Sequence, residues 1–440
     1  MRFFKSLYDT ARLYGRWMEA EFKTAPKPCP GADKRHLLIL TEVLPPYVSG
    51  GVYRPTSWLR FGGENNWRVS AVGAELSNKI TPAGEYLKES IPDNATLAYA
   101  PDPKIQPAWR LSPRLQGGFL SALKLYRTAV ARFGDDPPSV IVATGPSFFS
   151  YVAGMWAARY FGAKLVLDYR DEWTECPFDF VKTSSWDIWW EKRCLDRADK
   201  VFFTTEAMLK HQLEVFPNLS APKCAVQPNG WDSTDVPDMV PQAHEKDGKD
   251  LQYLTFLGNL PDWLLPDDFL ASFAQLLTKR PDYRSRIGLR FVGIQSPLAR
   301  KALDAFPYPE NIKTQGLVTK PEAERLARES FALLTLTSVD LARYRPGKVI
   351  EYLASDRPLL VYGAPGEVSA LVSRLGAGVF VGRHDVTALE AAVARLFNDP
   401  PESWKNAERR AWTAANSRRA LAKGFFASLD GLIEPDAFRQ

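Results

Sequence analysis

Lys348 and Glu351 are the residues whose types and spacing point most directly to chemistry in this 440-residue chain. They are three positions apart, so on a helix both side chains project from one face of the same turn. Pro346 precedes them, and proline suits the first turn of a helix because its missing N–H would have no partner there. A lysine at a helix N-terminus favours phosphate, and a carboxylate one turn later can accept hydrogen bonds from sugar hydroxyls. The turn therefore indicates a nucleotide-sugar site.

A second candidate is a loop with two adjacent glycines. Gly50 and Gly51 lie between an expected strand, 36–41, and a helix expected to start near Tyr53. Glycines at such a position let backbone amides approach a diphosphate closely, although an ordinary turn would also explain them. The loop does not match the GxGxxG pattern, so the sequence lacks the dinucleotide-binding fingerprint.

A third candidate is a group of charged residues that follows an expected strand, 164–168. Arg170 and Asp171 stand there, two positions ahead of Trp173. Charged side chains at the end of a buried strand are typical of a polar site, and charges on a solvated loop are the alternative.

The elements that must position these residues are short apolar runs alternating with helical patterns. In the first half of the chain we expect strands at 36–41, 68–72, 139–143, 164–168, 200–204 and 223–227. In the second half we expect strands at 253–258, 288–293, 332–337, 358–363 and 378–382. This alternation predicts an α/β protein with parallel sheets that helices cover on both faces.

The length of the chain predicts two domains of about 200 residues each. Residues 232–250 are rich in Asp, Pro and Lys and poor in apolar residues, which indicates a linker. We therefore expect a helical extension (1–33), a first Rossmann-like domain (34–231), the linker, a second Rossmann-like domain (251–403), and helices that cross back (404–440). In two doubly wound sheets, ligands bind at the carboxyl ends of the strands, so a cleft between the domains is the expected site.

Composition narrows the classes of protein. Hydrophobic residues make up 45% and charged residues 24%, and no apolar run reaches the ~18 residues that a membrane span needs. The N-terminus lacks the features of a signal peptide, so we expect a cytoplasmic protein. The four cysteines form no CxxC pair and the four histidines are scattered, so no metal site is predicted. A net charge of +5 is mild, and nucleic acid is not an expected partner.

The first 24 residues combine aromatic and basic side chains. On a helix, arginines would flank one apolar stripe made of Phe4, Leu7, Tyr8, Ala11, Tyr14 and Met18. Such a helix could lie in a membrane interface, or it could pack on the first domain as an additional helix. The sequence leaves both readings open.

Together these motifs resemble the GT-B glycosyltransferases of family 4, close to the bacterial polysaccharide-assembly branch. The resemblance spans about 37–397, and residues 1–33 lie outside it. The motifs, in order, are Pro45-Pro46-x-x-x-Gly50-Gly51, Ala143-Thr144-Gly145-Pro146, Leu167-Asp168-Tyr169-Arg170-Asp171-x-Trp173, Pro228-Asn229-Gly230-x-Asp232, Phe256-Leu257-Gly258-Asn259 and Pro346-Gly347-Lys348-x-x-Glu351-Tyr352-Leu353. The last of these is the most specific.

The resemblance implies a retaining transfer from a nucleotide sugar to a glycan or lipid-linked acceptor, without a required metal or other cofactor. It also implies work in polysaccharide or cell-surface glycan biosynthesis, which leaves peripheral association with the inner face of the membrane open. By position, Glu351 matches the glutamate that holds the donor ribose. Lys348 and the amides near Gly347 would face the diphosphate, and Gly50 and Gly51 would approach the same phosphates.

The chain departs from the family pattern at three places. Arg343 stands where many members have a glutamate near the transferred sugar. Asn259 and Leu265, which follow Gly258, stand where many members carry an arginine and a lysine at the departing diphosphate. Arg170 replaces a common histidine, and with Asp171 it belongs to the acceptor side.

The expected catalytic groups follow from the charge that develops on the leaving phosphate. Lys348 is the first candidate to stabilise that charge, with Arg343 or Arg345 as substitutes for the missing basic pair. Asp171 is the candidate to orient or deprotonate the acceptor hydroxyl.

Other classes of protein fit less well. A non-catalytic GT-B module that binds a nucleotide, a glycan or a partner enzyme is the main alternative, and the missing basic pair favours it. A sugar epimerase of the same fold would need a histidine at a strand end, which the sequence does not offer. A dehydrogenase is disfavoured because GxGxxG is absent.

Overall fold

The computed structural model describes residues 2–24, 35–76, 80, 82–102, 105, 107–108, 110–232, 251–399 and 401–434. It divides into two compact units, Met1–Pro228 with Arg418–Gln440, and Asn229–Ser417. Most of the predicted linker, 233–250, lies outside the described residues. None of the helices in the described ranges is both long and apolar enough to cross a membrane.

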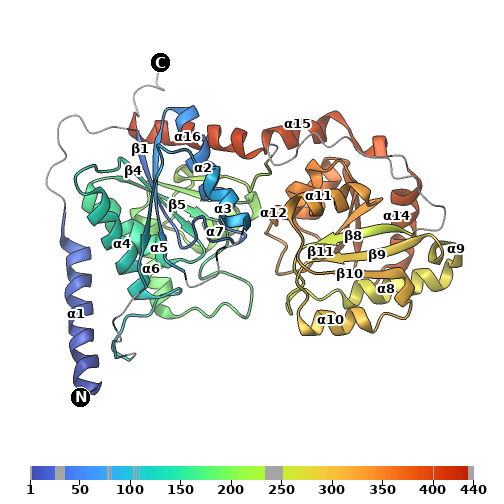
Figure 1. Ribbon diagram of the computed structural model, residues 1–440, viewed down its shortest axis with the longest axis horizontal. Coiled ribbons are helices and arrows are strands. Elements are labelled where there is room, and N and C mark those ends of the chain that lie inside the picture. Colours follow the sequence, from blue (N-terminus) through green and yellow to red (C-terminus); the bar gives the residue numbers. More distant parts are fainter. Residues whose placement is uncertain are drawn as a thin grey trace. The chain divides into compact units, whose positions relative to one another are not determined.

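The first unit is built on a parallel sheet with strand order β3-β2-β1-β4-β5-β6-β7 (Figure 1). Its strands are β1 (His36–Leu40), β2 (Arg68–Ala74), β3 (Thr96–Ala100), β4 (Val140–Gly145), β5 (Lys164–Tyr169), β6 (Lys200–Phe203) and β7 (Cys224–Val226). Its helices are α1 (Arg2–Phe22), α2 (Tyr53–Phe61), α3 (Pro82–Glu89), α4 (Phe119–Phe133), α5 (Phe149–Phe161), α6 (Ser185–Arg197), α7 (Glu206–Val215) and α16 (Arg418–Ile433). All five residues of β1 are buried, as a strand covered on both faces requires.

The second unit repeats this plan with strand order β10-β9-β8-β11-β12-β13, again all parallel. Its strands are β8 (Gln252–Leu257), β9 (Ile287–Val292), β10 (Ile312–Gln315), β11 (Ala332–Thr337), β12 (Leu359–Gly363) and β13 (Gly378–Gly382). Its helices are α8 (Asp267–Lys279), α9 (Pro281–Arg284), α10 (Pro297–Asp304), α11 (Lys320–Glu329), α12 (Gly347–Ala354), α13 (Glu367–Arg374), α14 (Val386–Asn398) and α15 (Ala407–Ala415). The strand order reverses between β8 and β11, where doubly wound sheets bind ligands.

The C-terminal helix α16 completes the core of the first unit. Phe425 stacks on Trp58 of α2 with ring centroids 4.3 Å apart, and Phe426 and Leu429 are also buried there. Because this packing buries the apolar face of α16, the core of the first unit includes a segment that is more than 180 residues away in sequence.

The second unit extends to Ser417, beyond the expected end at 403, because α15 is fastened to α12. Arg409 of α15 is fully buried, and burial lowers its pKa to about 10. Its guanidinium donates to the carbonyl oxygens of Leu353, Trp404 and Arg357 at 3.1, 3.0 and 2.8 Å. The cation thereby satisfies carbonyl groups around the C-terminus of α12, where positive charge is favoured.

The structure confirms the predicted alternation and adds two strands that the sequence did not predict. These are β3 and β10, which form one edge of each sheet. Neither strand is fully buried. The strand β10 reads Ile-Lys-Thr-Gln and lacks an apolar run, whereas β3 reads Thr-Leu-Ala-Tyr-Ala and was missed although it is largely apolar. Pro346 also differs from expectation. It caps α12 from outside the helix, with φ −56° and ψ 139°, and does not belong to the first turn.

Candidate functional site

The site in the second unit is organised by a tyrosine that joins α12 to the carboxyl end of β8. The buried Tyr352 hydroxyl accepts a hydrogen bond from the Leu257 amide at 2.7 Å and donates one to the Leu257 carbonyl oxygen at 2.9 Å. Burial raises the pKa of Tyr352 well above its usual range, so the hydroxyl keeps its proton for this pair. The N-terminal turn of α12 is thereby held beside the loop that begins at Gly258.

Lys348 lies in that turn and reaches back over β8. Its Nζ is 3.7 Å from the centroid of the Phe256 ring. A side chain at position 258 would begin 3.4 Å from the same Nζ, and Gly258 has φ +134°, a conformation that favours glycine. The predicted donor residues Gly258 and Lys348 are therefore neighbours in space, although 90 positions separate them in sequence.

The ammonium group of Lys348 has no compensating anion within the described residues. No hydrogen bond or ion pair from a described residue reaches it, and burial lowers its pKa to about 7. A half-buried cation held only by an aromatic ring gains strongly from an anionic ligand. The site can therefore hold a phosphate group at the start of α12.

Other predicted donor residues differ in how they are used. The Asn259 side-chain oxygen accepts from the Ile294 amide at 3.1 Å, so it fastens the loop after β8 to the loop after β9. Arg345 forms an ion pair with Glu367 at 2.7 Å, which engages its charge within the chain. Position 347 has no heavy atom within 4 Å of the place where a Cβ would stand, so its backbone is open to a ligand.

Glu351 and Arg343 keep the positions that the sequence predicts. Glu351 is exposed on α12 one turn beyond Lys348, and Arg343 is half-buried in the segment between β11 and α12. Their roles toward a ligand remain predictions.

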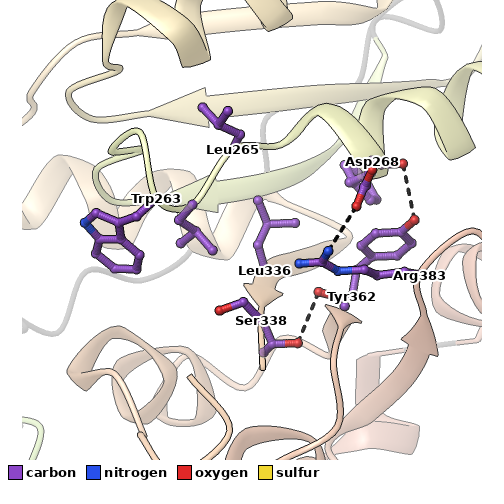
Figure 2. A pocket seen from close by; sticks show the side chains of 11 residues that line it. Trp263, Leu265, Asp268, Leu336, Ser338, Tyr362 and Arg383 are labelled. Carbon is purple, nitrogen blue, oxygen red and sulfur yellow. Dashed lines mark hydrogen bonds and ion pairs between the residues drawn. The ribbon is translucent and has the colours of Figure 1, made fainter. Parts of the chain in front are cut away.

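A small pocket opens at the carboxyl ends of β11 and β12 (Figure 2). The residues that line it are Trp263, Leu264, Leu265, Asp268, Phe269, Leu336, Thr337, Ser338, Tyr362, Gly363 and Arg383. In Figure 2 the Arg383 guanidinium faces Asp268, and the two are 3.4 Å apart. Leu265, which stands where the family commonly has a basic residue, is an apolar wall of this pocket. No sequence motif predicted this pocket, and only the expected strand ends pointed to its place.

In the first unit, Gly51 is a glycine because of Arg170. A Cβ at position 51 would lie 1.7 Å from an Arg170 guanidinium nitrogen, whereas one at position 50 would meet nothing within 4 Å. Arg170 is itself fixed, donating from Nε to the Gly145 carbonyl oxygen at 2.6 Å and from Nη2 to that of Pro146 at 2.8 Å. The group that lies close to the backbone at Gly51 is thus the Arg170 guanidinium of the chain itself. The approach of a diphosphate to this backbone remains a prediction.

Asp171 follows Arg170 and is half-buried. Burial raises the pKa of this carboxyl group, and the neighbouring Arg170 charge opposes the rise only in part. No hydrogen bond or ion pair to Asp171 occurs within the described ranges, so the carboxylate is available to a hydroxyl group. A raised pKa suits a group that must take up a proton near neutral pH.

Three polar residues of this region were not singled out from the sequence, and they support the two loops. Arg54 donates to the buried Asp168 at 2.7 Å and to the Gln227 carbonyl oxygen at 2.6 Å. Thr144 donates to the other oxygen of Asp168 at 2.7 Å, so one carboxylate joins β4, β5 and α2. Glu191 of α6 accepts from the Thr174 amide at 3.0 Å, and burial raises its pKa to about 7.

Comparison with known proteins supports the predicted resemblance. Residues 93–230 match the family model of the glycosyl transferase 4-like domain. No curated protein sequence matches the chain.

Among solved structures, sucrose-phosphate synthase (tll1590) from Thermosynechococcus elongatus matches with a TM-score of 0.65 and 14% identity, covering 91% of this chain and 100% of that one. The E. coli trehalose-6-phosphate structure bound with UDP-2-fluoro glucose matches with a TM-score of 0.66 and 14% identity, covering 90% and 98%. Anabaena Alr3699/HepE in complex with UDP and glucose matches with a TM-score of 0.63 and 12% identity, covering 90% and 100%. The chain thus has the two-domain GT-B fold.

Proposed function

We propose that this chain, which has the GT-B fold and a glycosyl transferase 4-like domain, is a retaining glycosyltransferase. It moves a sugar from a nucleotide-sugar donor to a glycan or lipid-linked acceptor. It acts in the biosynthesis of polysaccharide or other cell-surface glycan, on the cytoplasmic side of the membrane. Retention is supported by the family resemblance of the 346–353 segment, and the donor class by the chemistry of the site.

The observation that carries the proposal is the unpaired Lys348 ammonium at the start of α12. Its charge has no carboxylate partner among the described residues, and it stands beside Gly258 at the point where the strand order reverses. A diphosphate at this position would gain the charge of Lys348 together with the amides of the first helical turn.

The same arrangement favours bond cleavage over mere binding. As the bond between the sugar and the diphosphate breaks, negative charge grows on the leaving phosphate, and a diphosphate bound at Lys348 would have that charge stabilised by the ammonium group. Arg343 is the second candidate cation. The departing phosphate can take the acceptor proton in a front-face transfer, and Asp171 is the group to orient or deprotonate the hydroxyl. The proposal requires no metal or other cofactor.

Two structural neighbours hold UDP or a UDP-sugar analogue, which makes uridine donors the first class to test. A thermal-shift screen of the purified chain against nucleoside diphosphates and their sugars identifies the preferred donor, because a ligand that binds only the folded state raises the melting temperature. Release of nucleoside diphosphate from that donor is then measured for Lys348→Ala and Glu351→Gln. Matched controls are Lys301→Ala on α10 and Glu408→Gln on α15, both exposed.

We expect each site variant to lose most of the activity and each control to keep it. If Lys348→Ala and Glu351→Gln both release product at the wild-type rate, the site assignment is wrong.

A non-catalytic GT-B module is the second candidate. Asn259 and Leu265 favour it, because one fastens a loop and the other forms an apolar pocket wall where the family commonly has two cations. Calorimetry separates the two functions. A module would bind a nucleotide without forming product, or would bind none, whereas a transferase binds the donor and consumes it.

A further inference from the structure

Helix α1 is attached firmly to the first unit along one face. Leu13 and Ala20 are completely buried, and α1 contacts α4 and α5. Figure 1 shows α1 running beside these helices, with its first turns extending past them. The Tyr14 hydroxyl also donates to the Leu111 carbonyl oxygen at 2.7 Å.

Glu21 is the main polar attachment of α1. Its carboxylate accepts from the indole nitrogens of Trp17 and Trp156 at 2.9 and 3.0 Å. It also accepts from both terminal nitrogens of Arg193 on α6, at 2.9 and 2.7 Å. These bonds lower the pKa of Glu21, although burial alone would raise it. A bidentate pair with two further donors fixes the orientation of α1 as well as its position.

The opposite face of α1 is a stripe of exposed apolar side chains. Phe4, Tyr8, Met18 and Phe22 are 75%, 63%, 55% and 64% exposed. With the small residues at 11 and 15 between them, they follow the spacing of one helix face. Because packing and hydrogen bonds attach the opposite face of α1 to the first unit, the helix cannot easily rotate to bury this stripe.

The stripe has a basic flank, and α6, which contacts α1 through Trp17, carries two further partly exposed tryptophans. Trp186 lies beside α1, with its ring centroid 6.5 Å from that of Trp17, and it is partly exposed, as is Trp189. The exposed charged side chains described on α1 are Lys5, Arg12 and Glu19, and the exposed Lys23 follows the helix directly. Three of the four are basic, because the other acidic residues of α1, Asp9 and Glu21, are buried.

The basic side chains beside the stripe lie close enough together to affect one another's pKa. Burial, followed by the charges of Arg127 and Arg12, lowers the pKa of Arg16. Glu19 is the exposed acidic side chain described on α1. Its carboxylate forms ion pairs with Lys23 at 3.2 Å and with Arg127 at 3.0 Å. The surface around the stripe therefore carries an excess of positive charge.

We infer that this face of α1 lies in the headgroup region of an anionic lipid bilayer. Exposed aromatic side chains beside a basic flank fit the interface between acyl chains and anionic headgroups. A second copy of the chain is a less suitable partner, because an antiparallel symmetric contact would place one basic flank against the other. The inference rests on the proposed function in one respect only. If the acceptor is lipid-linked, binding of α1 to the membrane would bring that acceptor close to the first unit.

Vesicle flotation of the purified full chain tests the inference. The probes are vesicles of phosphatidylcholine alone and vesicles of equal parts phosphatidylcholine and phosphatidylglycerol. We expect binding to the anionic vesicles to be about tenfold or more tighter than to neutral ones, and to weaken in high salt. Replacing Phe4, Tyr8 and Phe22 together by serine should weaken binding about hundredfold, because each aromatic side chain loses its apolar contact with lipid.

Charge reversal provides an independent arm. Lys5→Glu with Arg12→Glu should weaken binding to anionic vesicles about tenfold or more and leave neutral vesicles unaffected. The matched controls are Tyr86→Ser with Leu298→Ser, on α3 and α10, and a reversal of two exposed lysines on α8 and α10, Lys279→Glu with Lys301→Glu. Both control pairs should float as wild type does.

Three results would overturn the inference: no binding to anionic vesicles, serine variants that float as wild type, or a stripe that serves only a dimer. A stripe that serves only a dimer would be recognised by light scattering. The chain would self-associate, the triple serine variant would abolish that self-association, and the wild type would not bind vesicles. Turnover of the donor in detergent keeps the two proposals separate. A chain that floats but consumes no nucleotide sugar contradicts the glycosyltransferase proposal alone, and a chain that turns over but does not float contradicts the membrane proposal alone.

Discussion

Donor binding should depend on pH through Lys348, because burial destabilises its ammonium group unless an anion binds beside it. Its pKa is lowered to about 7 by burial, and a bound diphosphate would raise it again by supplying the missing negative charge. Binding therefore takes up a proton when the lysine starts out neutral. The perturbation to apply is a change of pH across neutrality, in the wild type and in Lys348→Met, which keeps the length of the side chain and removes the charge.

The size of the effect follows from the pKa. Below about pH 7 the lysine is already charged, so affinity is constant there, and above it affinity falls about tenfold per pH unit until the pKa of the bound state is reached. Between about pH 6 and pH 8.5 the wild type should lose roughly 30-fold, or about 2 kcal/mol. Lys348→Met should bind about 10- to 100-fold more weakly than wild type at low pH and show no such slope.

Isothermal calorimetry with a nucleotide sugar is the assay, since the diphosphate of such a donor keeps its charge over this pH range. Titrations above neutrality in two buffers of different ionisation enthalpy count the protons taken up. Wild-type affinity that does not change with pH, or a slope that persists in Lys348→Met, would refute the role given to Lys348.

The same pKa shift affects the stability of the folded chain without added donor. The unfolded chain has a lysine with the ordinary pKa of 10.5, so between about 7 and 10.5 it binds more protons than the folded chain does. Stability linked to Lys348 therefore increases as the pH rises through this window. Lys348→Met should raise the melting temperature near neutral pH, as expected of a residue kept for function at a cost in stability.

Three further predictions concern residues that support the site. Gly51→Ala should destabilise the first unit by about 1–3 kcal/mol, because its Cβ would overlap the Arg170 guanidinium; Gly50→Ala is the control, and equal melting temperatures of the two would contradict the packing described. Arg409→Met should cost about 2–4 kcal/mol by leaving buried carbonyl oxygens unsatisfied, whereas Arg410→Met, at an exposed neighbouring position, should be neutral in the same denaturation experiment. Asp171→Asn should lower the transfer rate about 100-fold with unchanged donor affinity, and an unchanged rate would leave proton removal to the departing phosphate.

Sequence reasoning predicted the fold well where one physical signal dominated. Strands buried on both faces, such as β1 and β11, are continuous apolar runs bounded by turn residues, and their limits were predicted within a residue or so. Edge strands such as β10 lack that signal because one edge faces no partner strand and polar residues are tolerated.

The site was predicted in part. Lys348 and Gly258 were identified from separate motifs, and the structure places them together. Sequence spacing could not show that Lys348 is held over Phe256 without a counter-charge, because burial depends on tertiary packing. At Gly51 the predicted approach to a diphosphate stays a prediction, and the group that leaves no room for a side chain there is Arg170, a neighbour that lies 119 positions away.

The N-terminal helix shows a second limit of pattern reading. The sequence indicated an apolar stripe on α1, with packing on the domain or contact with a membrane as alternatives. The structure shows one face packed on the first unit and the other exposed. Leu13 and Glu21 attach the helix, and Phe4 and Phe22 point outward. Periodicity alone could not tell which of the two faces is covered.

Proton NMR of the purified chain with its preferred nucleotide sugar tests the central claim most directly. The signal of the donor's anomeric proton should disappear as nucleoside diphosphate forms, and the first sugar product, with water or an acceptor, should keep the anomeric configuration of the donor. Lys348→Ala should slow this conversion strongly. A donor that binds but is never consumed, or a first product with inverted configuration, would contradict the proposal of a retaining glycosyltransferase.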